Sequence, residues 1–128
     1  MIEGIEARNY QEYRHLIWPF LENFASRDLD GMTAEEIEYE ILDRRTQVWN
    51  INNFQAVALT RVTRDAVRLE RCAGIRRHEW QNEMVDALEN WARALGKKRF
   101  IGTIRQGWWP FAKERGYKEK HREVVRKL

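Results

Sequence analysis

The chain has 128 residues, of which 43% are hydrophobic and 34% are charged, and its formal net charge is +3. This size and apolar content predict one domain, 1–128, with a core of its own, and exclude an intrinsically disordered chain. One cysteine, Cys72, excludes a disulfide framework and is typical of the cytoplasm. The lack of a secretion signal and of an apolar run of roughly 20 residues excludes a membrane span.

The N-terminal segment predicts a short strand followed by a helix. The strand covers Ile2 to Arg8, and Asn9 with Glu12 three residues later resembles a helix cap. Apolar residues then recur at helical spacing, at Tyr10, Tyr13, Ile17, Leu21 and Phe24. Pro19 lies inside this pattern, so we expect it to kink or split the helix.

A second helix is predicted after the polar break that ends at Gly31. Thr33 and Glu36 form a capping-box pattern at its start. Its buried stripe consists of Ile37, Ile41 and Leu42. Arg44 and Arg45 are placed near its end, where positive charge complements the helix dipole.

Three strands are predicted next, in a meander. Gln47 to Ile51 and Phe54 to Arg64 are joined at Asn52-Asn53, because asparagine tolerates the positive φ of tight turns. Ala56 to Leu59 is apolar on both faces, as expected of a central strand covered on both sides. Ala66 to Cys72 forms the third strand.

The rest of the chain predicts helix, strand, helix and strand. Trp80 to Leu95 is an amphipathic helix that ends at Gly96, with a stripe of Trp80, Met84, Leu88, Trp91 and Leu95. A strand around Phe100 leads to a glycine turn and a short helix with Pro110 in its first turn and Gly116 at its end. The order of elements predicts an α/β domain in which helices flank a mixed sheet.

The segment from Glu89 to Leu128 resembles the C-terminal half of GNAT-type (Gcn5-related) acyltransferases, most closely the short GNAT-like proteins of phage and prophage genomes. The match is carried by Trp91, Ala92, Gly96, Gly107, Trp108, Gly116 and Tyr117. The resemblance implies a mixed, mostly antiparallel sheet flanked by about four helices. It also implies a cytoplasmic protein of the host cell or a protein within a phage particle.

In active members of this family, a glycine-rich R/Q-x-x-G-x-G/A run binds the pyrophosphate of acetyl-CoA at a helix N-terminus. The corresponding run here, Cys72 to Trp80, has one glycine where the pattern has two. The resemblance therefore implies cofactor-binding positions at Gly74, Arg76 and Arg77, with the cradle degraded by bulky neighbours.

The family's catalytic positions are also changed. The tyrosine that protonates the leaving thiolate corresponds to Ala112, and neither Tyr117 nor Tyr39 matches that position. Glu70 is the only carboxylate in the strand before the cradle, so it is the one candidate for a general base, against the alternative of a solvent-facing strand residue.

We expect the remaining potentially reactive residues, the histidines and the cysteine, to have structural roles. The histidines His15, His78 and His121 have no metal-ligand spacing, so we expect no metal site. Cys72 is expected to pack as a small hydrophobe rather than act as a nucleophile.

The basic C-terminal region suggests a third hypothesis, that the chain binds nucleic acid. Eleven Lys and Arg stand against three Glu from Lys97 onward, and Trp108, Trp109 and Phe111 could stack on bases. We expect instead a solvated basic surface, with these rings in the core or an interface, and no specific nucleic-acid binding.

Two hypotheses of function follow. The first is a GNAT-fold protein of phage or prophage type that has lost acetyl transfer, needs no cofactor, and binds a protein partner as a virion-associated or structural module. The alternative is an acetyl-CoA-dependent N-acetyltransferase with a non-standard phosphate loop, since positioning alone contributes much of the rate of a two-substrate reaction. Either protein could form a homo-oligomer.

Overall fold

The computed structural model describes residues 1–120 and 123–128, which form one seven-stranded sheet in the order β1-β2-β3-β4-β5-β7-β6. The strands are β1 Ile2–Ile5, β2 Gln47–Ile51, β3 Ala56–Val62, β4 Ala66–Gly74, β5 Arg99–Thr103, β6 Lys118–Lys120 and β7 Glu123–Lys127. Every pair of neighbours is antiparallel except β4 and β5, which are parallel.

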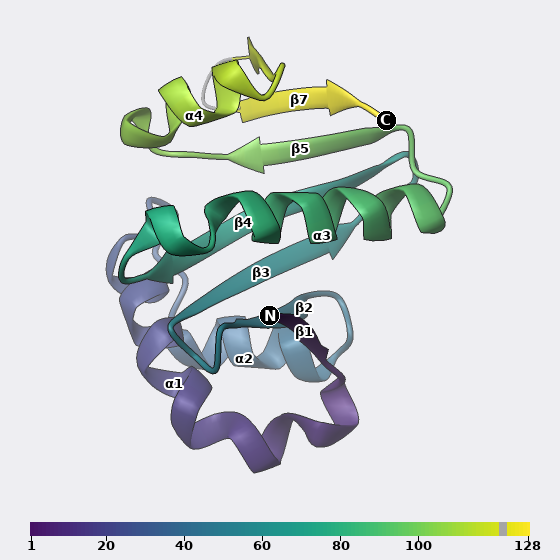
Figure 1. The fold of residues 1–128 in the computed structure, drawn as a ribbon. Coiled ribbons are helices and arrows are strands. Elements are labelled where there is room, and N and C mark those ends of the chain that lie inside the picture. The colour runs from purple at the N-terminus through teal and green to yellow at the C-terminus, as the bar shows by residue number, and fades with distance from the viewer. Residues whose placement is uncertain (121–122) are drawn as a thin grey trace.

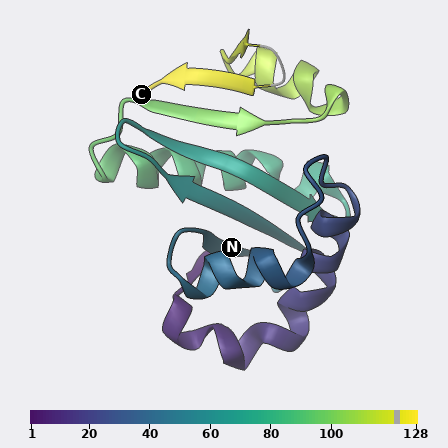
Figure 2. The same cartoon turned by 180° about the vertical axis from the view of Figure 1, so that it is seen from behind.

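Four helices cover the two faces of the sheet (Figures 1 and 2). They are α1 Tyr10–Ser26, α2 Ala34–Leu42, α3 Gln81–Ala94 and α4 Trp109–Glu114. Single turns of 3-10 helix precede α1, α3 and α4, at η1 Ala7–Asn9, η2 Arg77–Glu79 and η3 Gln106–Trp108. The predicted mixed, mostly antiparallel sheet flanked by helices is therefore confirmed.

The central strand β3 divides the core into two clusters. Ala56 and Ala58 pack with the α3 and α4 side, while Val57 and Leu59 pack with α1 and α2. All four are at most 1% exposed, because successive strand residues point to opposite faces and both faces are covered. The apolar run in the sequence correctly predicted this strand.

The N-terminal helix lacks the predicted cap, and of the two effects expected of Pro19 it shows a bend and not a split. Asn9 occupies the N-cap position, but its side chain makes no capping hydrogen bond, because its backbone is helical instead of extended. Helix α1 continues through Pro19 as one element and is not split there. The α1 ribbon changes direction along its course (Figure 1), which is the accommodation expected where a proline removes one intrahelical hydrogen bond.

Helix α2 begins as predicted and ends earlier than predicted. Thr33 accepts a hydrogen bond from the Glu36 N–H, and the Glu36 carboxylate accepts one from the Thr33 N–H, which completes the capping box. Leu42 is exposed, so it is not part of the buried stripe. Arg44 and Arg45 follow the helix and do not lie in its last turn.

The turn between β2 and β3 is longer than two residues. Asn52, Asn53 and Phe54 all have positive φ, and β3 starts only at Ala56. The N–H of Phe54 donates to the Asn50 side chain at 2.6 Å, which stabilises this left-handed run.

Helix α3 buries a stripe shifted from the predicted one. Trp80, Met84 and Leu88 are buried as expected, whereas Leu95 is 45% exposed and Trp91 is half-buried against Trp49. Gln81, Val85, Glu89 and Ala92 complete the buried face. Gly96, with φ of 75°, ends the helix as predicted.

The C-terminal region contains two strands where one was predicted. Gly116, with φ of 86°, and Pro110 in the first turn of α4 occupy the predicted positions. The following chain forms β6 and then β7, and β7 enters the sheet between β5 and β6.

A buried carboxylate, Glu89 on α3, holds this region in place. It is 2% exposed and accepts hydrogen bonds from the Tyr117 hydroxyl and from Arg126 on β7, the latter at 3.0 and 3.2 Å. Arg115 lies 3.5 Å from the same carboxylate. Burial and the hydrogen bond to Glu89 raise the pKa of Tyr117, so this hydroxyl stays protonated.

We predict that Glu89→Ala lowers the free energy of unfolding by about 3–5 kcal/mol, because Arg126 and the buried Tyr117 hydroxyl lose their acceptor, whereas Arg115 keeps Asp86. Glu22→Ala is the control, since Glu22 is exposed and forms no ion pair in the described part of the chain; it should change stability by about 0.5 kcal/mol or less. Urea denaturation measures both. A loss for Glu89→Ala as small as the control's would contradict the assignment.

Candidate functional site

A wedge opens where the parallel strands β4 and β5 separate. They pair only from Ala66 to Leu69 of β4, opposite Arg99 to Gly102 of β5. Beyond this point β4 runs on to Gly74, whereas β5 ends at Thr103. The carboxyl ends of parallel strands meet at one edge, where ligands commonly bind in open α/β sheets.

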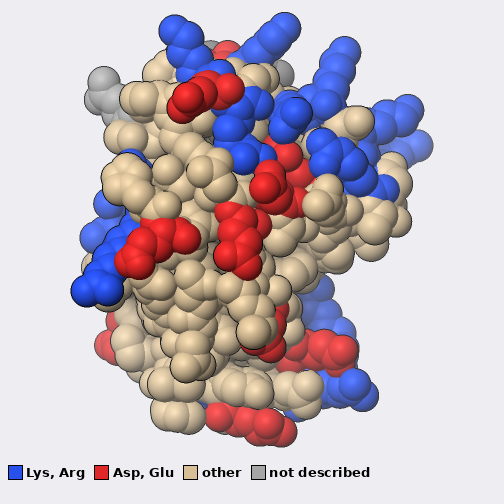
Figure 3. All heavy atoms as spheres, in the orientation of Figure 1, with Lys and Arg blue, Asp and Glu red and all other residues tan. Residues whose placement is uncertain are grey.

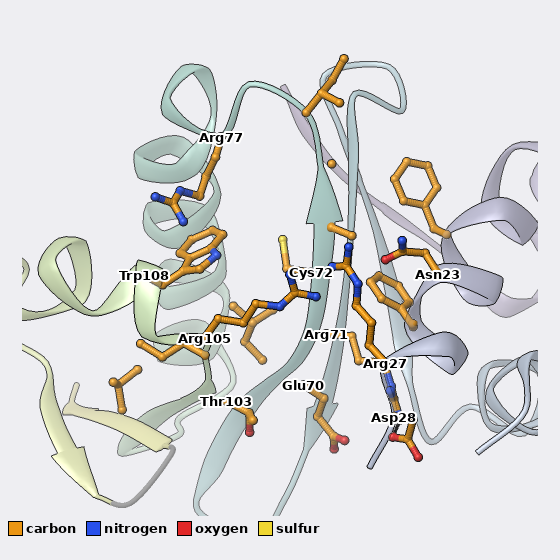
Figure 4. A pocket seen from close by; sticks show the side chains of 18 of the residues that line it. Asn23, Arg27, Asp28, Glu70, Arg71, Cys72, Arg77, Thr103, Arg105 and Trp108 are labelled. Carbon is orange, nitrogen blue, oxygen red and sulfur yellow. Dashed lines mark hydrogen bonds and ion pairs between the residues drawn. The ribbon is translucent and has the colours of Figure 1, made fainter. Parts of the chain in front are cut away.

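A cleft of about 1740 Å³ occupies this wedge. Figure 4 shows its three walls. The first is the second half of β4 with the loop to α3, the second is the chain from Thr103 to Trp109, and the third is the end of α1 with the loop to α2. The sheet and three helices thus converge on one hollow.

A β-bulge in β4 re-aims the side chains that face the cleft. Arg71 pairs with Leu59 and Leu69 with Thr60, which leaves Glu70 without a partner in the register. Glu70 and Arg71 both contact groups from the α1–α2 face, while the Cys72 sulfur lies 3.7 Å from that of Met84 on α3. Bulges of this kind redirect a strand beside functional sites.

Glu70, the candidate base, lies in this cleft. Its carboxylate is 3.0 Å from the Arg61 guanidinium, which also pairs with Glu40 of α2. The side chain is 36% exposed. It is therefore a positioned carboxylate at the floor of a cleft, chemically able to accept a proton from a bound amine.

The predicted cofactor-binding residues lie together at the mouth of the cleft, but each has a local role. At Gly74 a Cβ atom would approach that of Ala56 to 2.3 Å, so close strand packing requires this glycine. Arg76 has φ of 55° and lies 3.8 Å from Glu79. The Arg77 guanidinium stacks 4.7 Å above the Trp108 ring.

The loop before α3 is fixed by its own hydrogen bonds. The Trp80 indole donates to the carbonyl of Ile75 at 2.8 Å, and the Ile75 N–H donates to Gln55 on the neighbouring turn. Among the described backbone hydrogen bonds, the N–H groups of Arg76, Arg77 and His78 have no acceptor, as expected at a helix start. Three donors and two arginines thus surround the mouth.

Three further arginines in the cleft, Arg27, Arg71 and Arg105, were missed by the sequence analysis. Arg105 follows β5 and Arg27 follows α1; both are exposed and neither forms an ion pair within the described residues. Figure 4 shows Arg105 extending across the cleft toward Cys72 on β4. The position of Arg105 just after a strand parallel to β4 was the available signal, since such residues share an edge of the sheet.

No tyrosine replaces the missing thiolate acid in the described part of the cleft. Ala112 is 5% exposed and packs in the α3-side core. The Tyr117 hydroxyl is bound by Glu89, and Tyr39 lies on α2 beside Arg45, outside the cleft lining.

The other reactive residues form no second centre. Burial raises the pKa of Cys72 to about 12, so its thiol stays protonated and is a poor nucleophile. His15 and His78 are exposed, and His121 lies outside the described residues. Within residues 1–120 and 123–128, no three His, Cys, Asp or Glu side chains gather as a metal site would require.

The rings proposed for base stacking pack internally. Trp108 contacts Trp80 and Phe111, with ring centroids 6.0 and 5.9 Å apart. Among the basic residues of the same region, Lys97 donates to a backbone carbonyl and Arg99 pairs with Asp65 at 2.7 Å. No helix in the described part of the chain is long and apolar enough to cross a membrane.

No protein-family model matches the chain, and no curated protein matches it in sequence. Solved structures match it in shape. A GNAT-family acetyltransferase from Listeria monocytogenes gives a TM-score of 0.64 at 10% identity, covering 100% of this chain and 94% of the other. The PaiA N-acetyltransferase from Thermoplasma acidophilum, in complex with coenzyme A, gives 0.65 at 8%, covering 100% and 98%. A chain of the AtaT–AtaR complex bound to DNA gives 0.64 at 14%, covering 99% and 93%.

The chain therefore has the GNAT fold, as the resemblance implied. At these identities the likeness establishes the fold alone. The expectation that no cofactor binds finds no support here, because a protein of the same fold holds coenzyme A.

The loop from α1 to α2 is tied to the cleft by Asp28. Its carboxylate accepts a hydrogen bond from the Met32 N–H at 2.8 Å and one from Arg71 on β4 at 3.0 Å. The backbone hydrogen bond from Met32 and the contact with Arg71 hold the pKa of Asp28 below its usual value. The loop is thus anchored by an ionised carboxylate.

We predict that Asp28→Asn is less stable than the wild type at pH 6, and that the difference shrinks as the pH falls below about 4. A carboxyl group with a lowered folded-state pKa stabilises the fold above its unfolded pKa of about 3.9, and this contribution is lost as the pH falls through the folded value. Thermal unfolding midpoints of both proteins at pH 6 and pH 3 measure it. An equal difference at the two pH values would contradict the role given to this ion pair.

Proposed function

We propose that the chain binds an acyl-CoA thioester in the cleft and transfers the acyl group to an amine. The observation that carries the proposal is the wedge between β4 and β5, open at its mouth to a helix start and arginines and closed at its floor by Glu70. An acyl-CoA carries phosphate groups at one end and a narrow thioester arm at the other. These two ends suit the mouth and the floor of the cleft. The coenzyme A in the PaiA structure, which has the same fold, supports the choice of ligand.

The charge of the mouth favours an anion. Arg76 and Arg77 line it, together with the N–H groups before α3, and Arg105 reaches across the cleft toward Cys72. Arginine binds phosphate oxygens through a planar fork of donors, and backbone N–H groups at a helix start add to it. Arg105 is the member of this set without an internal partner in the described chain, so it loses no existing contact when it binds phosphate.

The chemistry at the floor would proceed as a direct transfer. The amine nitrogen forms a bond to the thioester carbonyl carbon, its proton passes to Glu70, and the carbon–sulfur bond breaks. The bulge leaves Glu70 without a partner on β3, and a backbone N–H directed into the cleft at this point would stabilise the developing oxyanion. With Ala112 in place of a tyrosine, water must protonate the departing thiolate, which lowers the rate without abolishing transfer.

A second candidate is a GNAT-fold module of phage or prophage type that binds a protein partner and transfers nothing. It is favoured by one observation: the acid position is filled by the buried Ala112, while the nearby Tyr117 hydroxyl is occupied by Glu89. The two candidates differ in whether coenzyme A binds and turns over.

We predict that acetyl-CoA binds with a dissociation constant of roughly 10–100 µM, and that Arg105→Ala weakens binding about tenfold, which corresponds to about 1.4 kcal/mol. Calorimetric titration measures both. Arg64→Ala is the matched control, because it removes an exposed arginine at the opposite end of β4 and should leave the affinity unchanged. Binding weaker than about 1 mM, or an equal loss of affinity in both variants, would contradict the acyltransferase proposal and favour the second candidate.

We further predict that Glu70→Gln lowers the rate of acetyl transfer to amines at least about tenfold while acetyl-CoA affinity stays within about twofold. Raising the pH should partly restore the rate, since more of the amine is then already deprotonated. Thiol release with an amine panel measures transfer. Tight acetyl-CoA binding without any turnover would instead support the non-catalytic module.

A further inference from the structure

The chain separates its charges along the sequence. Residues 1–43 contain eleven Asp and Glu against three Arg, a net charge of −8. The last 32 residues, from Lys97, contain eleven Lys and Arg against three Glu, a net charge of +8. The overall charge of +3 therefore includes two segments whose net charges have equal magnitude and opposite sign.

The fold carries this separation into space. The sheet places β1 at one edge and β6 at the other, with the N-terminal helices at the β1 end and the C-terminal strands at the β6 end (Figure 1). Figure 3 shows Lys and Arg gathered over the region of β5, β7 and α4. The molecule thus has an acidic end, residues 1–43, and a basic end, residues 97–120 and 123–128, which face each other across the cleft.

Part of each end's charge has no internal partner. Glu12, Glu22 and Glu35 at the acidic end are exposed and form no ion pair among the described residues. The same holds for Lys113, Lys118 and Lys127 at the basic end. Charges that are not neutralised within the chain are available to a partner.

We propose that copies of this protein associate head to tail, with the acidic end of one copy against the basic end of the next. Like ends repel, so a two-fold symmetric dimer through either end is disfavoured. The acidic end of one copy attracts the basic end of another. A head-to-tail contact of this kind that does not close into a ring continues as an open chain of copies. This proposal is independent of acyl transfer.

The edge strands act in the same direction. Charged side chains on an edge strand normally prevent two sheets from joining edge to edge. Here β1, with Glu3, has a net charge of −1, and β6, with Lys118, Glu119 and Lys120, has a net charge of +1. The repulsion therefore acts between like edges and not between unlike ones.

A second copy fits better than a nucleic acid. A polyanion would account for the basic end alone and would be repelled by the acidic end. Arg99, Arg115 and Arg126 of the basic end are engaged in internal ion pairs. The described basic residues without an ion pair are therefore mostly scattered lysines, with Arg105 in the cleft as the exception. Each copy of the chain already carries both an acidic and a basic end, so a second copy can supply the oppositely charged partner.

The test uses two variants of the full chain. The acidic-end variant carries Glu12→Lys, Glu22→Lys and Glu35→Lys, and the basic-end variant carries Lys113→Glu, Lys118→Glu and Lys127→Glu. Each reversal leaves its end nearly neutral and the other end intact. Circular dichroism melting confirms that both fold, and sedimentation velocity at low salt measures assembly.

Wild-type protein should sediment faster as its concentration rises to about 200 µM in 50 mM NaCl, and the association constant should fall at least about tenfold at 300 mM. Each variant alone should stay monomeric. An equimolar mixture should form a dimer that does not grow further, because only one pair of unlike ends remains. If a variant misfolds, the salt dependence of wild-type association still tests the proposal.

A wild type that remains monomeric at low salt would overturn the proposal. So would a mixture of the variants that shows no dimer while both are folded. Tight, salt-sensitive binding of a short DNA duplex by a monomeric wild type would assign the basic end to nucleic acid instead.

Discussion

The short parallel pairing of β4 and β5 is the constraint on which the site depends. Four paired positions join the two halves of the sheet, and beyond them the strands diverge because β5 turns into the chain that leads to α4. The bulge at Glu70 lies at the point of divergence. The cleft therefore opens where β5 leaves β4, and the bulge at this point directs the Glu70 carboxylate into it.

The elements around the cleft are held by a few polar contacts between distant parts of the chain. Asp28 ties the α1–α2 loop to β4, Arg77 ties the α3 loop to Trp108, and Glu89 ties α3 to β7. These contacts replace the covalent cross-links that a chain with one cysteine lacks. Of the cleft arginines, Arg71 and Arg77 are engaged in these contacts, whereas Arg105 forms no ion pair among the described residues.

Local chemistry predicted most of the fold. The capping box, the apolar central strand and the glycine stops depend on neighbouring residues and were predicted correctly. The cap at Asn9 was wrong because Asn9 has a helical backbone, and the stripe position of Leu95 was wrong because this residue is 45% exposed. The buried Glu89 could not be predicted, since its partners lie 28 and 37 residues away. Gly74 was placed in the cleft from its motif, and its packing against Ala56 became visible only in the structure.

The central claim is that the wedge between β4 and β5 holds the thioester arm of an acyl-CoA. Hydrogen–deuterium exchange with and without coenzyme A tests it most directly. The account predicts slower exchange in two segments, from Glu70 to His78 and from Thr103 to Trp108, with no change in β1 or β2. Unchanged exchange in both segments, or protection elsewhere on the sheet, would contradict it.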